Sequence, residues 1–231
     1  MEALEAIRAR RSVRRYLDEP VPAATVDRLL RLALLAPTES MAQAWSFVVV
    51  RDRRADLAEL VVSGGGEYFR IMRAPGEGVS DAAHADWARG YAEQLVGRVR
   101  AAPVWIVPVH VPRRSIPAPH RAGLEEHERV AELMSLAFAI ENLMIGARAL
   151  GLGTLPTNFH GLAEGGFRDL LDLPPEVSAP IITPLGRPDG STSAGDGRGP
   201  RACGASCGRA RRSRAAAGIP RRAAWSRSSA S

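Results

Sequence analysis

The sequence predicts an α+β domain in which helices outnumber a few short strands. Three features of the 231 residues support this class. Residues 21–37 carry apolar side chains at helical spacing, and residues 45–50 and 102–111 are short apolar runs with the length of buried strands. Residues 124–150 form a longer apolar stretch that suits a central helix.

The N-terminal part is expected to contain two helices followed by a strand. Residues 2–9 predict a short helix that leads into the segment "RRSVRRY". A second helix is expected within 21–37, because Pro22 suits a first helical turn and Pro37 would end the helix. Its buried side is predicted to consist of Val26, Leu29, Leu30, Ala33 and Leu34. Residues 45–50, "WSFVVV", then predict a buried strand.

The middle of the chain is expected to contain two more helices and a second strand. An amphipathic helix is predicted at 54–62, and the three consecutive glycines at 64–66 are expected to end it in a flexible loop. Residues 83–100 predict a polar helix. The strand at 102–111 contains two prolines, which favours an edge position or a bulge because proline cannot donate to the ladder.

The C-terminal part is expected to finish the domain and then to change character. The helix at 124–150 should be central and buried, and a short strand or turn, a helix and a last strand are predicted after it, up to residue 186. From residue 191 the composition becomes rich in Gly, Ser, Ala and Arg, without the apolar periodicity that buries a core. We therefore expect one domain over residues 1–190 and a disordered or frameshifted tail over 191–231.

The charge and cysteine distributions exclude several function classes. Nine of the 31 basic residues and none of the 25 acidic ones lie in residues 197–231, which leaves residues 1–196 with a formal net charge of −3. A folded nucleic-acid-binding domain should instead carry its positive charge on the surface that meets phosphate. Both cysteines lie in the tail and the five histidines are scattered, so no metal site is expected. No signal peptide or membrane span is predicted, and the expected location is the cytoplasm.

Three groups of polar residues could carry chemistry. The first comprises Arg10, Arg11, Ser12 and Arg14, which could form a solvated basic turn or capture an anion, since guanidinium groups match phosphate geometry. In an extended segment residues 10, 12 and 14 would share one face. The second is the polar set Thr38, Ser40 and Gln43 in "APTESMAQAWSFVVV", which could be a plain connection or could bind a flat, polar-edged ligand.

The third group combines Ser135, on the buried helix, with the segment "GLGTLPTNF" that follows the helix. A serine on an apolar helix commonly bonds to its own backbone. The hydrolytic motifs G-x-S-x-G and H-E-x-x-H and the P-loop are absent from the sequence. The residues alone therefore predict an α+β domain with an anion-plus-ring pocket.

Four segments in a fixed order resemble one known family. They are "RRSVRRYLDEPVP", "APTESMAQAWSFVVV", "AIENLMIGARALGLGT" and "PLGRP". In content and order they are similar to the signatures of the FMN-dependent nitroreductases, and together they cover about residues 4–190. The resemblance implies a nitroreductase-like α+β fold, with a mainly antiparallel sheet flanked by helices. It also implies a homodimer that binds FMN at the subunit interface.

The resemblance also assigns roles to individual residues. Arg10, Ser12 and Arg14, with Arg11 beside them, would meet the phosphate, the ribityl chain and the N1/O2 edge of FMN. Further contacts with the cofactor are implied for Pro37, Thr38, Glu39, Met41, Ser135, Leu155, Pro156, Thr157 and Arg198. Ser135 could come from the partner chain, and Arg198 could reach the phosphate. No catalytic side chain is implied, because hydride would pass from NAD(P)H through flavin N5 to a nitroaromatic, quinone or other oxidised acceptor in a ping-pong reaction.

Two departures from the family pattern keep alternatives open. Met41 stands where the family usually has asparagine, and the sequence beyond Pro200 differs from the usual apolar ending. A first alternative is a flavin-consuming dimethylbenzimidazole synthase, in which an apolar residue also replaces the asparagine. Ser12 argues against it, because an acidic residue is expected there. A second alternative is a non-catalytic flavin-binding protein whose arginine tail binds anionic polymers.

Overall fold

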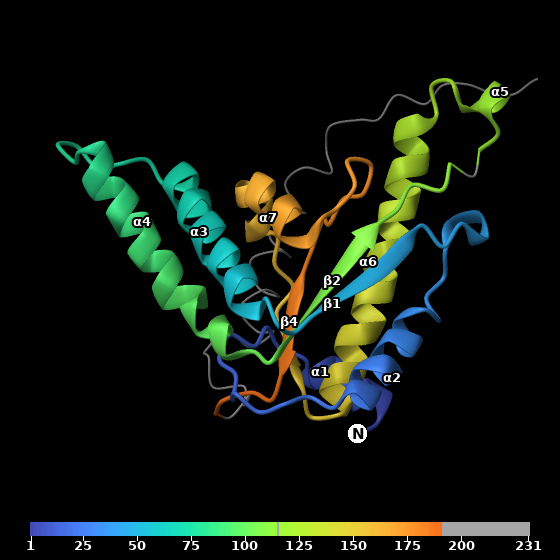
Figure 1. Cartoon of the computed structure of the whole chain (residues 1–231), viewed down its shortest axis with the longest axis horizontal. Coiled ribbons are helices and arrows are strands. Elements are labelled where there is room, and N and C mark those ends of the chain that lie inside the picture. The colour runs from blue at the N-terminus through green and yellow to red at the C-terminus, as the bar shows by residue number, and fades with distance from the viewer. Residues whose placement is uncertain (115, 191–231) are drawn as a thin grey trace, which may run out of the picture. The chain divides into compact units, whose positions relative to one another are not determined.

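A four-stranded antiparallel sheet with the strand order β1-β2-β4-β3 forms the centre of the domain (Figure 1). The computed structural model describes residues 1–114 and 116–190. The strands are β1 (Trp45–Val50), β2 (Val104–His110), β3 (Gly153–Thr154) and β4 (Thr183–Gly186). In the register of the central pairs, Val48 lies opposite Val107, and Trp105 lies opposite Pro184. The predicted α+β class with an antiparallel sheet is confirmed.

Helices cover both faces of the sheet, with α2 and α6 on one side and α3, α4 and α7 on the other (Figure 1). The α-helices are α1 (Ala3–Ala9), α2 (Ala23–Ala33), α3 (Arg54–Met72), α4 (Asp81–Val96), α5 (Ala118–Arg121), α6 (Glu125–Ala149) and α7 (Glu164–Leu171). The described part of the chain also contains the 3₁₀ helices η1 (Glu39–Met41), η2 (Gly97–Ala101) and η3 (Phe159–Ala163). The strand β2 separates two hydrophobic cores, because its side chains alternate between them: Trp105 and Val107 belong to one, Val104 and Ile106 to the other.

The second helix is shorter than expected. It begins one residue after Pro22 and ends at Ala33, four residues before Pro37. Val26, Leu29 and Ala33 are buried as predicted, whereas Leu34, which follows the helix, is 48% exposed. Leu34 is eight residues after Val26 and would share its buried side in a continuous helix. Because the helix ends before Leu34, this side chain no longer falls on the buried side.

The expected flexible loop at the three glycines is wrong. Helix α3 runs through Gly64, Gly65 and Gly66, and all three are buried. A Cβ atom added at Gly64 would lie 1.9 Å from the carbonyl oxygen of Phe159, and one at Gly65 would lie 3.0 Å from the Phe159 ring. The glycines therefore permit the close approach of η3 to the helix, which compensates for their poor helix propensity.

The expected edge position for the second strand is also wrong, because β2 lies between β1 and β4. The backbone N–H of His110 donates to Ser178, on the side of β2 that faces away from β1. Pro108, two residues earlier, has its nitrogen on that same side. There β4 pairs only with residues 104–106, so the missing N–H of Pro108 leaves no gap in the ladder.

Helix α6 spans the length of the sheet and packs against α2 and β2. It is the one helix within residues 1–114 and 116–190 that is long and apolar enough to cross a membrane. Half of its most apolar window is buried inside the domain, as in the core helix of a globular protein. Gly151 follows the C-terminal end of α6 with a φ of 77°, a conformation that favours glycine.

The predicted boundary between the domain and its tail stays a prediction, because residues 191–231 lie outside the described residues.

Candidate functional site

The basic N-terminal segment lies against β3. Ser12 forms a parallel bridge with Thr154, and the backbone N–H of Val13 donates to the carbonyl oxygen of Thr154 at 2.9 Å. A Cβ atom on Gly153 would approach a Val13 methyl carbon to 2.7 Å, so this contact requires glycine. The structure therefore brings the first group of polar residues together with the "GLGT" part of the third.

The arginines of this segment differ in what they contact. Arg10 places Nε 3.7 Å from a carboxylate oxygen of Glu141, while its buried Nη1 has no hydrogen-bond partner among the described residues. Arg11 donates to the carbonyl oxygens of Arg8 and Arg10, at 2.8 Å each, and so caps the end of α1. Arg14 is exposed, and within residues 1–114 and 116–190 its side chain makes one hydrogen bond, a 3.4 Å contact with the carbonyl oxygen of Ser12. Arg10 and Arg14 are therefore the arginines best placed to receive an anion.

The segment 155–157 is held by Ile182 and by Thr183, the first residue of β4. Thr157 and Ile182 exchange two backbone hydrogen bonds of 3.0 and 2.9 Å, and the N–H of Leu155 donates to Oγ1 of Thr183 at 3.0 Å. Leu155 and Thr157 are buried, whereas Pro156 is half-buried. Of these three predicted site residues, Pro156 offers the most accessible side chain.

The segment 36–43 is a tight turn whose backbone is unusual. Ser40, Met41 and Gln43 have φ values of 42°, 57° and 47°, in the left-handed region that side chains other than glycine and asparagine rarely adopt. Oγ1 of Thr38 accepts a hydrogen bond from the Gln43 N–H at 2.9 Å and closes the turn. The polar residues of this segment are thus needed locally to shape it.

Ser135 anchors this turn from within the same chain. Its hydroxyl accepts a hydrogen bond from the Glu39 N–H at 3.0 Å and donates to the carbonyl oxygen of Ala131 at 2.8 Å. Ser135 is only 3% exposed. The expected bond to its own helix is present, and the second bond joins the turn to α6.

Two buried glutamates on the same helix were not singled out from the sequence. Glu128 and Glu132 are 5% and 2% exposed, and with Ser135 they occupy positions i, i+4 and i+7 of one helix face. We call these three residues the polar row of α6. Their spacing on one face of the helix, in line with Ser135, was the signal that could have revealed them.

The polar row of α6 binds backbone N–H groups of neighbouring segments. Oε1 of Glu132 accepts from the Arg113 N–H at 3.1 Å, and its Oε2 lies 2.6 Å from Nε2 of His110. Oε1 of Glu128 accepts from the Ile116 N–H at 2.7 Å. Together with the bond from Ser135 to the turn, these contacts hold the segment after β2 and residues 36–43 on one side of the helix.

The two groups of predicted site residues contact different parts of α6. Arg10 reaches Glu141, whereas the turn at Glu39 is bound to Ser135. Six residues separate the two helix positions, which places them about 9 Å apart along the axis and about a third of a turn apart around it. Within one chain, the basic segment and the turn are therefore attached to different sides of the helix. Arg198 lies outside the described residues.

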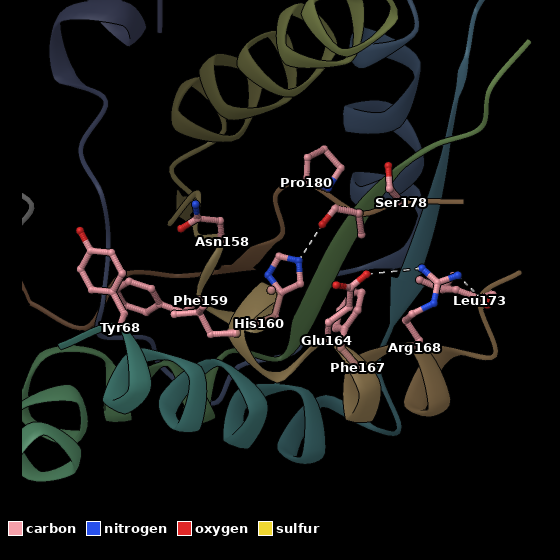
Figure 2. A pocket seen from close by; sticks show the side chains of 13 residues that line it. Tyr68, Asn158, Phe159, His160, Glu164, Phe167, Arg168, Leu173, Ser178 and Pro180 are labelled. Atoms are coloured by element: carbon pink, nitrogen blue, oxygen red, sulfur yellow. Dashed lines mark hydrogen bonds and ion pairs between the residues drawn. The ribbon is translucent and has the colours of Figure 1, made fainter. Parts of the chain in front are cut away.

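A cavity of about 430 Å³ lies on the α3 and α7 side of the sheet (Figure 2). Its walls include Tyr68, Phe159, Phe167 and His160. Nε2 of His160 lies 2.7 Å from the carbonyl oxygen of Ala179. Burial lowers the pKa of His160, so the ring is neutral and donates this nitrogen's proton to Ala179. The cavity begins next to the predicted segment 155–157, but the sequence did not predict it.

Comparisons with known proteins agree with the fold. The model of the nitroreductase family matches residues 7–187. A protein of Methanothermobacter thermautotrophicus, named for NADH dehydrogenase and NAD(P)H nitroreductase activities, is 27% identical over 190 residues, covering 81% of this chain and 78% of its own.

Solved structures share the same fold at lower identity. A BluB-like flavoprotein from Clostridium difficile has a TM-score of 0.65 at 20% identity, covering 88% of this chain and 97% of its own. An NADPH:FMN oxidoreductase from Vibrio harveyi has a TM-score of 0.57 at 18% identity, covering 81% and 69% of the two chains.

Proposed function

The chain belongs to the nitroreductase family, and we propose that it is an FMN-dependent oxidoreductase that passes hydride from NAD(P)H to a nitroaromatic, quinone or other small oxidised acceptor. Its family and its relative named for NAD(P)H nitroreductase activity support an oxidoreductase. FMN, when bound, would supply hydride transfer at N5 in two separate half-reactions. The protein would then supply binding, orientation and charge, which agrees with the lack of hydrolytic motifs in the sequence.

The state of Arg10 is the observation that carries this proposal. Its buried Nη1 has no partner among residues 1–114 and 116–190, which is costly unless a ligand oxygen accepts from it. Ser12 and Arg14 follow at alternate positions of the same extended segment and are exposed. Two guanidinium groups and a hydroxyl suit a phosphate and the polar edge of a flavin. These residues therefore fit the anionic part of FMN.

We propose that the ring site is completed by a second copy of the chain. The basic segment and the turn at 36–43 are attached to different sides of α6, as described above. Val130, Met134 and Phe138 form an apolar stripe along α6 and are 42%, 54% and 46% exposed. In a homodimer this stripe would be buried, and the turn of one protomer could meet the basic segment of the other.

In this arrangement Pro37, Thr38, Glu39 and Met41 would border the ring. Ser135 is fully engaged by backbone groups, so we propose that it positions the turn rather than touching FMN. Pro156 would present its half-buried side chain to the ring, supported by Leu155 and Thr157. A cytoplasmic location and a phosphate contact from Arg198 remain part of the proposal.

Flavin binding tests this proposal without requiring activity. The purified chain should quench the fluorescence of added FMN, and the bound flavin should lose its absorbance near 450 nm when NAD(P)H is added without oxygen. Arg10→Gln should weaken FMN binding about 10- to 100-fold, since it removes charge-assisted hydrogen bonds. Arg31→Gln is the matched control, because Arg31 is an exposed helix arginine paired with Asp27. A chain that binds no FMN, or equal affinities for both variants, would refute the assignment.

A further inference from the structure

We propose that the cavity on the α3 and α7 side of the sheet binds a small arylalkyl ammonium ion. The aromatic group of the ion would rest on Tyr68 and Phe159, and its ammonium group would lie beside the carboxylate of Glu164. None of these three residues belongs to the predicted flavin contacts. The inference does not depend on the proposed oxidoreductase activity.

One side of the cavity is aromatic. The ring centroids of Tyr68 and Phe159 are 5.2 Å apart, and their planes are inclined by 35°. Phe69 meets both rings at a steep angle, with its centroid 5.3 Å from Tyr68 and 5.8 Å from Phe159, and so fixes their orientation. Tyr68 and Phe159 are half-buried, so each keeps ring surface for a ligand. Rings held in this way suit a further aromatic group, which could stack or pack edge to face.

The other side of the cavity carries a carboxylate. Figure 2 shows Glu164 and Tyr68 on opposite sides of His160. Nη1 of Arg168 lies 3.8 Å from Oε1 of Glu164, at the outer limit of an ion pair, and the Glu164 side chain is 68% exposed. The carboxylate therefore keeps oxygen lone pairs that can meet the cation of a ligand.

The arginine in the cavity wall is already engaged by backbone oxygens. Arg168 donates Nη1 to the carbonyl oxygen of Val177 at 3.0 Å. Its Nη2 donates to the carbonyl oxygen of Leu173 at 3.3 Å and to that of Pro174. Three carbonyl dipoles thus point at the guanidinium group and fix it to the loop after α7. Arg168 is therefore poorly placed to receive an anionic ligand.

The charge of the surrounding segment favours a cation. Residues 161–180, which form most of the cavity wall, contain four acidic residues and one arginine, a formal net charge of −3. The His160 ring adds no positive charge, because burial lowers its pKa. A potential of this sign attracts cations and repels carboxylates. The acidic residues are Glu164, Asp169, Asp172 and Glu176.

The spacing of the two sides indicates the length of the ligand. Phe159 is the first residue of η3, and Glu164 begins α7 directly after it. At the 3₁₀ rise of about 2 Å per residue, these two positions are about 10 Å apart along the axis. A linker of about four carbons between ring and ammonium group covers most of this distance, and the Glu164 side chain covers the rest. The cavity volume of about 430 Å³ is large enough for such an ion.

Binding of 4-phenylbutylammonium to the full-length protein tests the proposal. Isothermal titration should show saturable binding, about 3- to 10-fold tighter than for the uncharged 4-phenylbutanol, because the alcohol lacks the ion pair and the cation–π contact. The anion 4-phenylbutyrate should bind more weakly than the alcohol. Equal affinities for the ammonium ion and the alcohol, or no binding of the ammonium ion, would overturn the proposal.

Two glutamate variants locate the cation. Glu164→Gln should lower the affinity for the ammonium ion to about that of the alcohol and should leave the binding of the alcohol unchanged. Glu176→Gln is the matched control, because it removes the same charge from an exposed residue of the same segment that does not line the cavity. The control should bind the ion as the wild type does. Equal losses in the two variants would indicate an effect of net charge alone and would contradict the role of Glu164.

Two further measurements locate the aromatic group. Tyr68→Leu should weaken the binding of the ammonium ion and of the alcohol by the same factor, about 3- to 10-fold, since both lose a ring contact. Circular dichroism checks that the variant is folded, and wild-type affinity in a folded variant would contradict the role of Tyr68. Saturation with FMN should leave the affinity for the ammonium ion unchanged, because the two sites share no predicted contact. Displacement of the ion by FMN would place it in the flavin site and would overturn the proposal.

Discussion

An ordinary surface helix buries its apolar side and exposes its polar side, whereas α6 has a polar row on its buried side and an apolar stripe on its exposed side. The polar row, Glu128, Glu132 and Ser135, is buried, whereas the apolar stripe of Val130, Met134 and Phe138 is about half exposed. Each side has its own physical reason. Buried carboxylates are tolerated because they accept backbone N–H groups and a histidine proton, and an exposed apolar stripe of this length is typical of an interface.

The comparison teaches that one helix organises both the inside of a protomer and its outer surface. Inside, the polar row fixes the turn at 36–43 and the segment after β2. Outside, the exposed stripe would be the contact surface of the proposed homodimer. If both statements hold, substitutions on the buried side should act on folding and those on the exposed side on assembly.

Removal of a buried carboxylate should have the largest effect. Glu132→Ala leaves His110 and the Arg113 N–H without their partner in a buried site, which should lower the free energy of unfolding by about 3–5 kcal/mol. Chemical denaturation followed by circular dichroism measures this. Glu126→Ala is the control, because Glu126 is exposed and its surface ion pair with Arg129 is screened by solvent, so that its loss should change the stability little. Equal losses in the two variants would remove the distinction between the two sides.

Charge on the exposed stripe should affect assembly instead. Met134→Glu should convert a dimer into a monomer at micromolar concentration while the monomer keeps its helical signal, because a carboxylate would be desolvated in the interface. Light scattering coupled to size exclusion gives the molar mass. Val79→Glu, at an exposed apolar residue outside α6, should stay dimeric. A wild-type monomer, or a dimer that tolerates Met134→Glu, would contradict the proposed interface.

The sequence predicts the helices and strands of this fold better than the tertiary contacts between them. Helical periodicity located α2, a short apolar run located β1, and four motifs predicted the family, because all of these signals lie in residues close along the chain. These signals missed the role of Gly64, since the reason for that glycine is the carbonyl oxygen of Phe159, about 95 residues later in the chain. Glu128 and Glu132 of the polar row were overlooked for the same reason. Their partners lie on segments whose positions only the folded chain defines.

In the candidate site, too, one part could be predicted from the sequence and another part could not. The basic segment could be predicted because alternate residues of an extended strand share a face, and the structure places it beside β3. The engagement of Ser135 with the Glu39 N–H depends on a turn with three positive φ values, which no local pattern in the sequence indicates. The same turn explains a residue that the sequence left as a departure from the family.

The smallest predicted effect concerns Met41, at the end of η1. Ser135 of the polar row holds this turn through its hydrogen bond with the Glu39 N–H. Met41 is 87% exposed and has a φ of 57°. Its side chain therefore buries almost nothing to offset the strain of the left-handed region. Asparagine, the residue expected at this position from the family pattern, adopts this region more readily than methionine.

Met41→Asn should therefore raise the free energy of unfolding, by up to about 1 kcal/mol, although it removes an apolar side chain. The increase should be visible as a shift of the urea midpoint without a change in slope. Met41→Leu is the control, since leucine has the same exposure but no preference for positive φ, and it should not stabilise the protein. If Met41→Asn also fails to stabilise, the strain in this turn is not what the family asparagine relieves. Its amide would then be needed for the ligand alone.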